Sequence, residues 1–145
     1  MSSETTPRRI VVGVDGSERS VAALEWALEE AEAHGGSVKV VTVWDVPSTI
    51  FLTPTFTEGD YADRATAALE HALGATGALS RGVPVVAETV MGNGGQTLVE
   101  IADGADLLVV AGHGLGHGGV PGAHLGSVAG YCAHHASCPT VIVRG

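Results

Sequence analysis

A chain of 145 residues with 45% hydrophobic and 16% charged residues has the composition of a single globular domain, with residues 1–8 expected to form a flexible N-terminus. The net charge of -9 leaves no basic face that could follow a nucleic-acid backbone, so nucleic acid is excluded as a partner. No apolar run approaches the roughly 18 residues of a membrane helix and no signal-peptide core follows the N-terminus, so we expect a cytoplasmic protein that does not bind membranes.

The first three expected elements form a βαβ unit. The run RIVVGVD, residues 9–15, is rich in β-branched residues and ends in a turn, which is typical of a strand. Apolar residues at helical spacing follow, and they predict a helix with Ser17 as its N-cap and Gly35 as its C-cap. The continuous apolar run VKVVTVW, residues 38–44, predicts a second strand that is covered on both faces.

The rest of the chain continues the alternation of strands and helices. Residues 45–58 carry two prolines and predict an irregular loop. The elements expected after this loop are a helix over 60–80, weakened near its end by Gly74 and Gly77, a strand over 83–90, a helix over 96–105, a strand over 106–111, a helix over 127–136 and a strand over 139–144. Five strands alternating with four helices predict an α/β fold, a three-layer α/β/α sandwich around a mostly parallel sheet.

Ligands of an open doubly wound sheet bind beyond the carboxyl ends of its strands, where the strand order reverses. Two of the loops expected at this edge are rich in glycine: GNGG at 92–95, which faces the crevice, and AGHGLGHGGVPGAHLGS at 111–127. Bare backbone lets consecutive N–H groups point at an anion, and the dipole of a following helix adds to the attraction. Gly126 and Ser127 open the fourth expected helix and are therefore placed to bind a phosphate. Ser127 would equally suit a helix N-cap, and glycine-rich loops often form only turns.

Two further features bear on the chemistry of this site. The chain has neither a Walker lysine nor a Rossmann fingerprint, so backbone and hydroxyl groups would hold a phosphate, with a divalent cation as the counter-charge. Asp15, at the tip of the first strand, would accept hydrogen bonds from a ribose or hold a metal ion through water. Alternatively, Asp15 would brace its own turn to Ser17.

Three stretches of the chain resemble the universal stress protein family: IVVGVDGSERSVAALEWA near the start, ADLLVVAG, and HGGVPGAHLGSVAGYCAHHASCPTVIVRG at the end. Their order and separation also match, so the resemblance covers nearly the whole chain. It implies a five-stranded parallel sheet of order 3-2-1-4-5, of the adenine nucleotide alpha hydrolase-like type, and homodimers that pair through the last strand. One branch of that family binds ATP through the motif G-x2-G-x9-G-[ST], and another branch lacks the motif and does not bind ATP.

The second half of this ATP motif is present, because Gly116 is followed after nine residues by Gly126 and Ser127. The first half departs from the motif. His113 stands where a glycine is expected, and AGHGLG is two residues longer than the family's usual stretch, so Gly112 or Ala111 would take the place of the first glycine. The resemblance further implies that Asp15 lies near the ribose, that Val43 meets the adenine edge with its backbone, and that the nucleotide-binding residues are Gly13, Val14, Asp15, Val43, Gly112, Gly116, Gly126, Ser127 and Val128.

These features favour a regulatory module of the stress response that binds ATP, or a related adenine nucleotide, with Mg²⁺ or Mn²⁺. We expect hydrolysis to be slow or absent, because no general base is evident beside the γ-phosphate and because Arg81 and Arg144 are expected far from the ligand loops. A nucleotide-free dimeric scaffold for stress protection or protein interaction stays open, since the first motif glycine is lost. A phosphoacceptor built on Asp15 would lack an adjacent acidic pair, and an FMN carrier would lack a phosphate cradle after the first strand.

The histidines and cysteines give weaker indications. Five of the seven histidines fall in the final third of the chain: His113, His117, His124, His134 and His135. The first two have a helical metal-ligand spacing, but the glycine content of their segment disfavours a helix, so we expect a structural or loop role. A milder hypothesis is that His113 offers a phosphate a hydrogen bond or a positive charge. Cys132 and Cys138 do not have a metal-binding spacing and are expected to be buried or partly buried thiols.

Overall fold

The computed structural model describes residues 7–46, 57–112 and 126–144. The elements in these ranges are β1 (Arg8–Gly13), α1 (Glu18–His34), β2 (Gly36–Trp44), α2 (Glu58–Thr76), the 3-10 turn η2 (Ala78–Ser80), β3 (Val85–Met91), α3 (Gly94–Ile101), β4 (Leu107–Ala111), α4 (Ser127–His135) and β5 (Thr140–Val143). The strands form one sheet of order β3-β2-β1-β4-β5 in which every neighbouring pair is parallel. This order confirms the predicted α/β fold. Of the expected flexible N-terminus, residues 1–6 lie outside the described ranges, and β1 begins one residue earlier than predicted.

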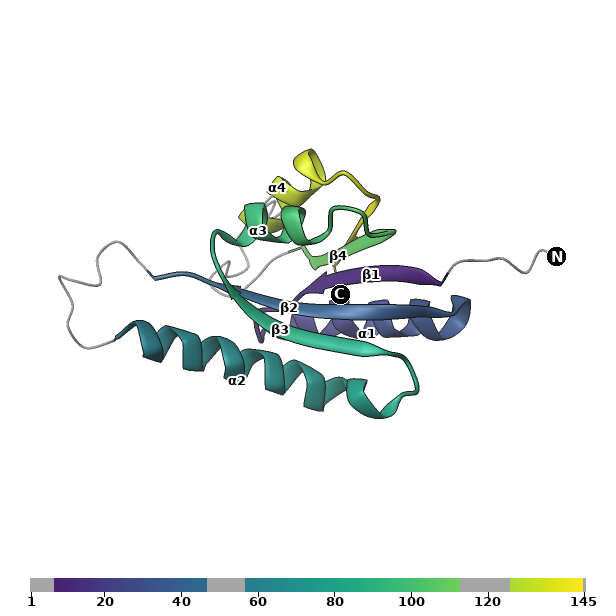
Figure 1. Cartoon of the computed structure of the whole chain (residues 1–145), viewed down its shortest axis with the longest axis horizontal. Helices are drawn as coiled ribbons and strands as arrows, with labels where there is room; N and C mark the ends of the chain where they lie inside the picture. The colour runs from purple at the N-terminus through teal and green to yellow at the C-terminus, as the bar shows by residue number, and fades with distance from the viewer. Residues whose placement is uncertain (1–6, 47–56, 113–125, 145) are drawn as a thin grey trace.

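The helices cover the two faces of the sheet in pairs. α1 and α2 lie on one face, and α3 and α4 lie on the other (Figure 1). Because side chains alternate along a strand, successive residues of β1 enter different cores: Ile10 and Val12 pack with Leu24 and Leu28 of α1, whereas Val11 packs on the α3 and α4 side. Burial on both faces explains why the central strands are continuous apolar runs in the sequence.

Local signals determine where the helices begin and end. The predicted caps of α1 are confirmed: the Ser17 side chain accepts a backbone hydrogen bond at its N-terminus, and Gly35 ends it in the left-handed conformation at φ 72°. Gly77, at φ 64°, ends α2 earlier than predicted, and η2 takes up the remaining residues. α3 begins earlier than predicted, because Asn93 caps it by accepting the Gln96 N–H through Oδ1 at 3.2 Å.

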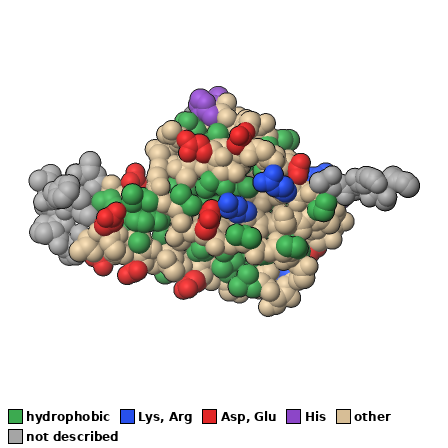
Figure 2. All heavy atoms as spheres, viewed as in Figure 1, with side chains coloured by type: hydrophobic (Ala, Val, Ile, Leu, Met, Phe, Trp, Pro, Cys, Tyr) green, Lys and Arg blue, Asp and Glu red, His purple; other side chains and the backbone are tan. Residues whose placement is uncertain are grey.

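The surface is mixed in charge. On the face drawn in Figure 2, acidic side chains are spread over the surface and Lys and Arg side chains lie between them. β3 and β5 are the edges of the sheet, and two large apolar side chains of β3, Val86 and Met91, are exposed. Within the described ranges, none of the helices combines the length and the hydropathy that a membrane span requires.

Candidate functional site

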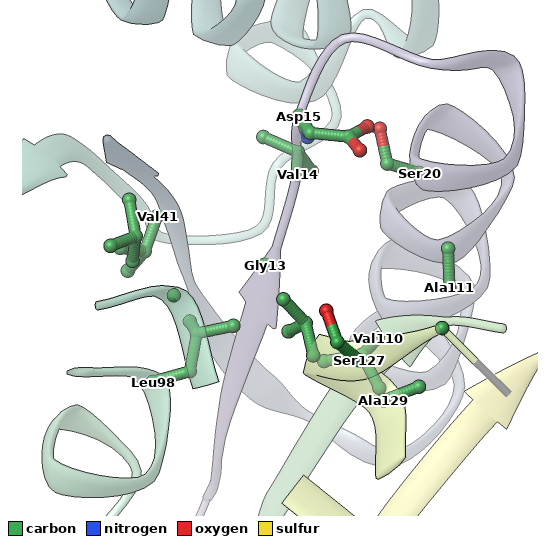
Figure 3. Close-up of a pocket in the computed structure, with 14 residues that line it drawn as sticks. Gly13, Val14, Asp15, Ser20, Val41, Leu98, Val110, Ala111, Ser127 and Ala129 are labelled. Atoms are coloured by element: carbon green, nitrogen blue, oxygen red, sulfur yellow. The ribbon is translucent and has the colours of Figure 1, made fainter. Parts of the chain in front are cut away.

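A cavity of about 230 Å³ opens at the carboxyl edge of the sheet, over the ends of β1, β2 and β4 (Figure 3). The first residues of α3 and α4 also line it. β1 pairs with β2 on one side and with β4 on the other, so the cavity lies where the strand order reverses. The residues that line it are Gly13, Val14, Asp15, Ser20, Val41, Val43, Gly94, Leu98, Val110, Ala111, Gly126, Ser127, Val128 and Ala129.

Most of the residues predicted to bind nucleotide therefore lie together in one cavity, although they come from three distant parts of the chain. Those that line it are Gly13, Val14, Asp15, Val43, Gly126, Ser127 and Val128. Gly112 is not among the lining residues, and its neighbour Ala111 is. Gly116 and His113 lie outside the described residues, as do His117 and His124.

The part of the cavity that faces β2 and α3 is apolar. Val41 and Val43 project from β2 on the same face of the sheet, and the buried side chain of Leu98 approaches from α3. Gly13, at the end of β1, adds only backbone to this wall. Apolar surfaces of this kind suit the ring of a nucleobase better than a charged group.

Asp15 occupies a tight turn that holds its carboxylate at the cavity. Its Oδ1 accepts the Ser17 N–H at 2.9 Å, so the alternative in which Asp15 braces its own turn is realised. Its backbone N–H donates to Ser20 Oγ at 3.1 Å, and the same Oγ donates to the Ser17 carbonyl at 2.9 Å. The Asp15 residue is nevertheless exposed and lines the cavity, so bracing the turn and facing a ligand are compatible.

Ser20 is a site residue that the sequence reasoning missed. It is only 2% exposed, and its hydroxyl joins Asp15 to the first turn of α1. A serine three residues after the N-cap Ser17 was the available signal, because short hydroxyl side chains near a helix start often bond to local backbone. The other lining residues that were not predicted, Val41, Leu98, Val110 and Ala129, look like ordinary core residues in the sequence.

The start of α4 presents backbone donors to the cavity. Gly126 is its N-cap and makes no side-chain capping bond, so the alternative in which Ser127 is the N-cap is wrong. Ser127 is instead the first helical residue, and it is exposed at the cavity. The first N–H groups of a helix have no partner within the helix, and the helix dipole makes this end attractive to an anion.

Gly112 is engaged in the sheet rather than open to the cavity. Its N–H donates to the Val143 carbonyl at 2.9 Å, which continues the pairing of β4 with β5. Its carbonyl accepts the Gly126 N–H at 2.6 Å, which ties the end of β4 to the start of α4. A role for Gly112 as the first glycine of the motif stays a prediction.

The two arginines differ in their position. Arg81 precedes β3, so it lies at the amino-terminal ends of the strands, far from the ligand loops as expected. There it pairs with Glu25 at 2.8 Å and with Glu32 at 2.7 Å. The expectation that Arg144 is also distant is wrong. Arg144 follows β5 at the carboxyl edge, and its Cγ lies 3.8 Å from the position of a Cβ built on Gly112. Parallel strands end at the same edge, which is why a residue after β5 returns to the ligand loops.

The described residues hold no group of three or more His, Cys, Asp or Glu side chains that could bind a metal ion. Asp15 is the one carboxylate among the described residues that line the cavity. Cys132 is buried and Cys138 is half-buried, and both are free thiols as predicted. Burial raises the pKa of the Cys132 thiol to about 11, and burial also raises the pKa of Cys138.

Comparison with known proteins adds evidence on the family and the fold. The model of the "Universal stress protein family" matches residues 6–144. The universal stress protein Rv2623 of Mycobacterium tuberculosis is 34% identical over an alignment of 159 positions, which covers 99% of this chain and 50% of that protein. The chain thus spans about half the length of the curated relatives that it matches.

Two solved structures share the fold over nearly all of both chains. A universal stress protein crystallised in complex with cAMP is 27% identical, with a TM-score of 0.71, and the match covers 94% of this chain and 97% of that chain. The universal stress protein UspA from Lactobacillus plantarum superposes with a TM-score of 0.78 at 24% identity, again over 94% of this chain and 97% of the other.

Proposed function

This chain belongs to the universal stress protein family, and we propose that it is an adenine-nucleotide-binding regulatory module of that family. The observation that carries the proposal is that an apolar wall, Asp15 and the start of α4, which has no side-chain capping bond, meet in one cavity. A protein of the same fold that is 27% identical to this chain was crystallised with cAMP, which supports the class of ligand.

In this proposal each part of the nucleotide meets matching chemistry. The base lies against Val41, Val43 and Leu98, and the ribose hydroxyls donate to Asp15. The phosphates accept hydrogen bonds from Ser127 and from the first N–H groups of α4. The cavity of about 230 Å³ is smaller than the roughly 300–1,000 Å³ of a typical drug-sized site, so we expect the phosphates to extend beyond its described part.

We propose ATP with Mg²⁺ or Mn²⁺ as the ligand and expect little or no hydrolysis. A hard divalent cation prefers oxygen ligands, which the phosphates would supply; contact with the cation through water is the alternative role of Asp15 to its contact with the ribose. The Oδ1 atom of Asp15 already accepts the Ser17 N–H, which makes this carboxylate a poor general base. ATP turnover should therefore stay well below the roughly 1–100 per second typical of kinases.

The proposal includes a homodimer in the cytoplasm, in which residues 1–145 of each chain form one universal stress protein domain. β5 lies at the edge of the sheet, and all four of its residues are only partly buried. An edge strand of this kind presents unpaired backbone groups that a second copy would satisfy. Sedimentation of a monomer at micromolar concentration would remove this part of the proposal.

The experiment that tests nucleotide binding is a calorimetric titration of nucleotide-stripped protein with ATP and Mg²⁺, repeated with AMP and with cAMP. We expect micromolar binding with one site per chain. Asp15→Asn keeps the size and the Oδ1 acceptor of the side chain but removes its charge, and should weaken binding about 10-fold or more. Asp103→Asn makes the same charge change after α3, at the other edge of the sheet, and should leave affinity unchanged.

One observation favours a second candidate, the nucleotide-free scaffold. The Gly112 N–H is used by the Val143 carbonyl, so this glycine offers no free amide to a phosphate. No detectable heat up to millimolar ATP, together with an unchanged melting temperature, would make the scaffold the better description.

A further inference from the structure

Two residues that line the cavity, one from β1 and one from α3, are in close contact. Gly13 is the last residue of β1, and a side chain at this position would point toward the face of the sheet that α3 covers. Leu98 points toward Gly13 from α3 (Figure 3). A Cβ built on Gly13 would lie 2.7 Å from Leu98 Cδ1 and 3.3 Å from Cδ2. Atoms at that separation overlap, so the side chain of Leu98 occupies the space that any other residue at position 13 would need.

The neighbours of Leu98 determine where it would go if it were displaced. Leu98 is only 4% exposed, and it packs in the same buried cluster as Val11, Val41 and Leu108. These neighbours are themselves 5%, 0% and 0% exposed, so the core side offers no room. The open volume beside Leu98 is the cavity that it lines. A methyl group at position 13 would therefore turn the Leu98 side chain into the ligand space.

We propose that Leu98, held against the bare backbone of Gly13, fixes the depth of the apolar part of the cavity and so restricts the base to adenine without an added group at N6, C2 or C8. Leu98 is in this sense a specificity-determining residue, and Gly13 is the residue that positions it. The inference rests on the proposed nucleotide function for its ligand, but the contact between Gly13 and Leu98 can be tested without any ligand.

The first experiment is done on the nucleotide-free protein with ¹³C-labelled leucine methyl groups. In Gly13→Ala, the two Leu98 methyl resonances should move to the values of a different rotamer, while the Leu69 methyl resonances stay in place. Leu69 is a matched control because it is similarly buried, at 7% exposed, on the opposite face of the sheet. Unchanged Leu98 resonances would overturn the proposed contact whether or not the protein binds nucleotide.

The second experiment measures affinity for AMP by calorimetry. Gly13→Ala should weaken binding about 10- to 100-fold, as overpacking a well-filled site does. Adding Leu98→Val, which shortens the displaced side chain, should restore most of the affinity. Gly74→Ala is the control for the glycine substitution, since a Cβ there meets no atom within 4 Å. Failure of the double variant to recover would contradict a steric origin of the loss.

The third experiment tests selectivity with three AMP analogues that carry an isopropyl group at N6, C2 or C8, because Leu98→Ala removes a group of that shape. For one of the three analogues, the ratio of its affinity to the affinity for AMP should be about 10-fold or more higher in Leu98→Ala than in the unchanged protein. The position of the isopropyl group in that analogue identifies the edge of the base that faces Leu98. Leu69→Ala should leave the preference unaltered. If the unchanged protein binds AMP but Leu98→Ala improves the relative affinity for no analogue, the depth hypothesis is wrong while the proposed function stands. If the unchanged protein binds no nucleotide, the proposed function is wrong, and the leucine methyl resonances still test the contact between Gly13 and Leu98.

Discussion

Ser20→Ala isolates the hydrogen bonds that hold Asp15 at the cavity. The Ser20 hydroxyl accepts the Asp15 N–H at 3.1 Å and donates to the Ser17 carbonyl at 2.9 Å. After substitution the Ser17 carbonyl still accepts the Val21 N–H at 3.0 Å, so it keeps a partner. The Asp15 N–H loses the acceptor that Ser20 provides. The structural damage is therefore confined to one backbone donor in the turn between β1 and α1.

The loss of folding stability in Ser20→Ala depends on how far the Asp15 N–H is shielded from water. Removing one partner of a buried hydrogen bond costs about 1–3 kcal/mol, and because the Asp15 residue is exposed we expect the lower end, about 1 kcal/mol. In a domain of this size such a loss lowers the melting temperature by about 3–5 °C. Urea-induced unfolding gives the free energy of unfolding, and a circular-dichroism melt gives the temperature.

Thr66→Ala is the matched control. Its hydroxyl also donates to a backbone carbonyl, that of Ala62 at 3.2 Å, but on the exposed face of α2. Alanine is the better helix former, so this variant should be unchanged or more stable by up to about 0.5 kcal/mol. If Ser20→Ala were as stable as Thr66→Ala, the hydrogen bonds of Ser20 would not be what holds the Asp15 turn.

Two further predictions concern stability away from the cavity. Gly74→Ala should stabilise the protein by about 0.5–1 kcal/mol, since a helix interior favours alanine and the added methyl group meets no atom within 4 Å. Gly77→Ala should destabilise it by about 1–2 kcal/mol, because φ at this residue is 64°. Urea titrations of both variants test this, and equal changes in the free energy of unfolding would contradict it. The free energy of unfolding should fall as the pH rises from about 9 to about 11, because burial raises the pKa of Cys132 to about 11 and the unfolded thiol loses its proton first. Cys132→Ala removes that contribution, so parallel pH dependences of the two proteins would refute the assignment.

Much of the candidate site was predictable because its residues carry local or motif-level signals. Asp15 ends a β-branched run, and Ser127 opens a helix after a glycine-rich stretch. Val43 became a candidate only through the resemblance to the universal stress proteins, and Leu98 gave no signal, since in the sequence it is one more apolar residue of an amphipathic helix. Its role depends on which strand α3 crosses, and that is a long-range property.

The sequence by itself determined the alternation of strands and helices and several of their ends, because these depend on neighbouring residues. Ser17 and Gly35 bound α1 through contacts within a few residues of themselves, and the apolar runs of β1 and β2 are continuous because both faces of the sheet are covered. Only the tertiary structure decided which residues meet. It brought Arg144 to the carboxyl edge against expectation, closed Gly112 into the pairing with β5, and set Leu98 on Gly13. Such contacts join segments tens of residues apart and are set by how whole layers pack, which no local pattern encodes.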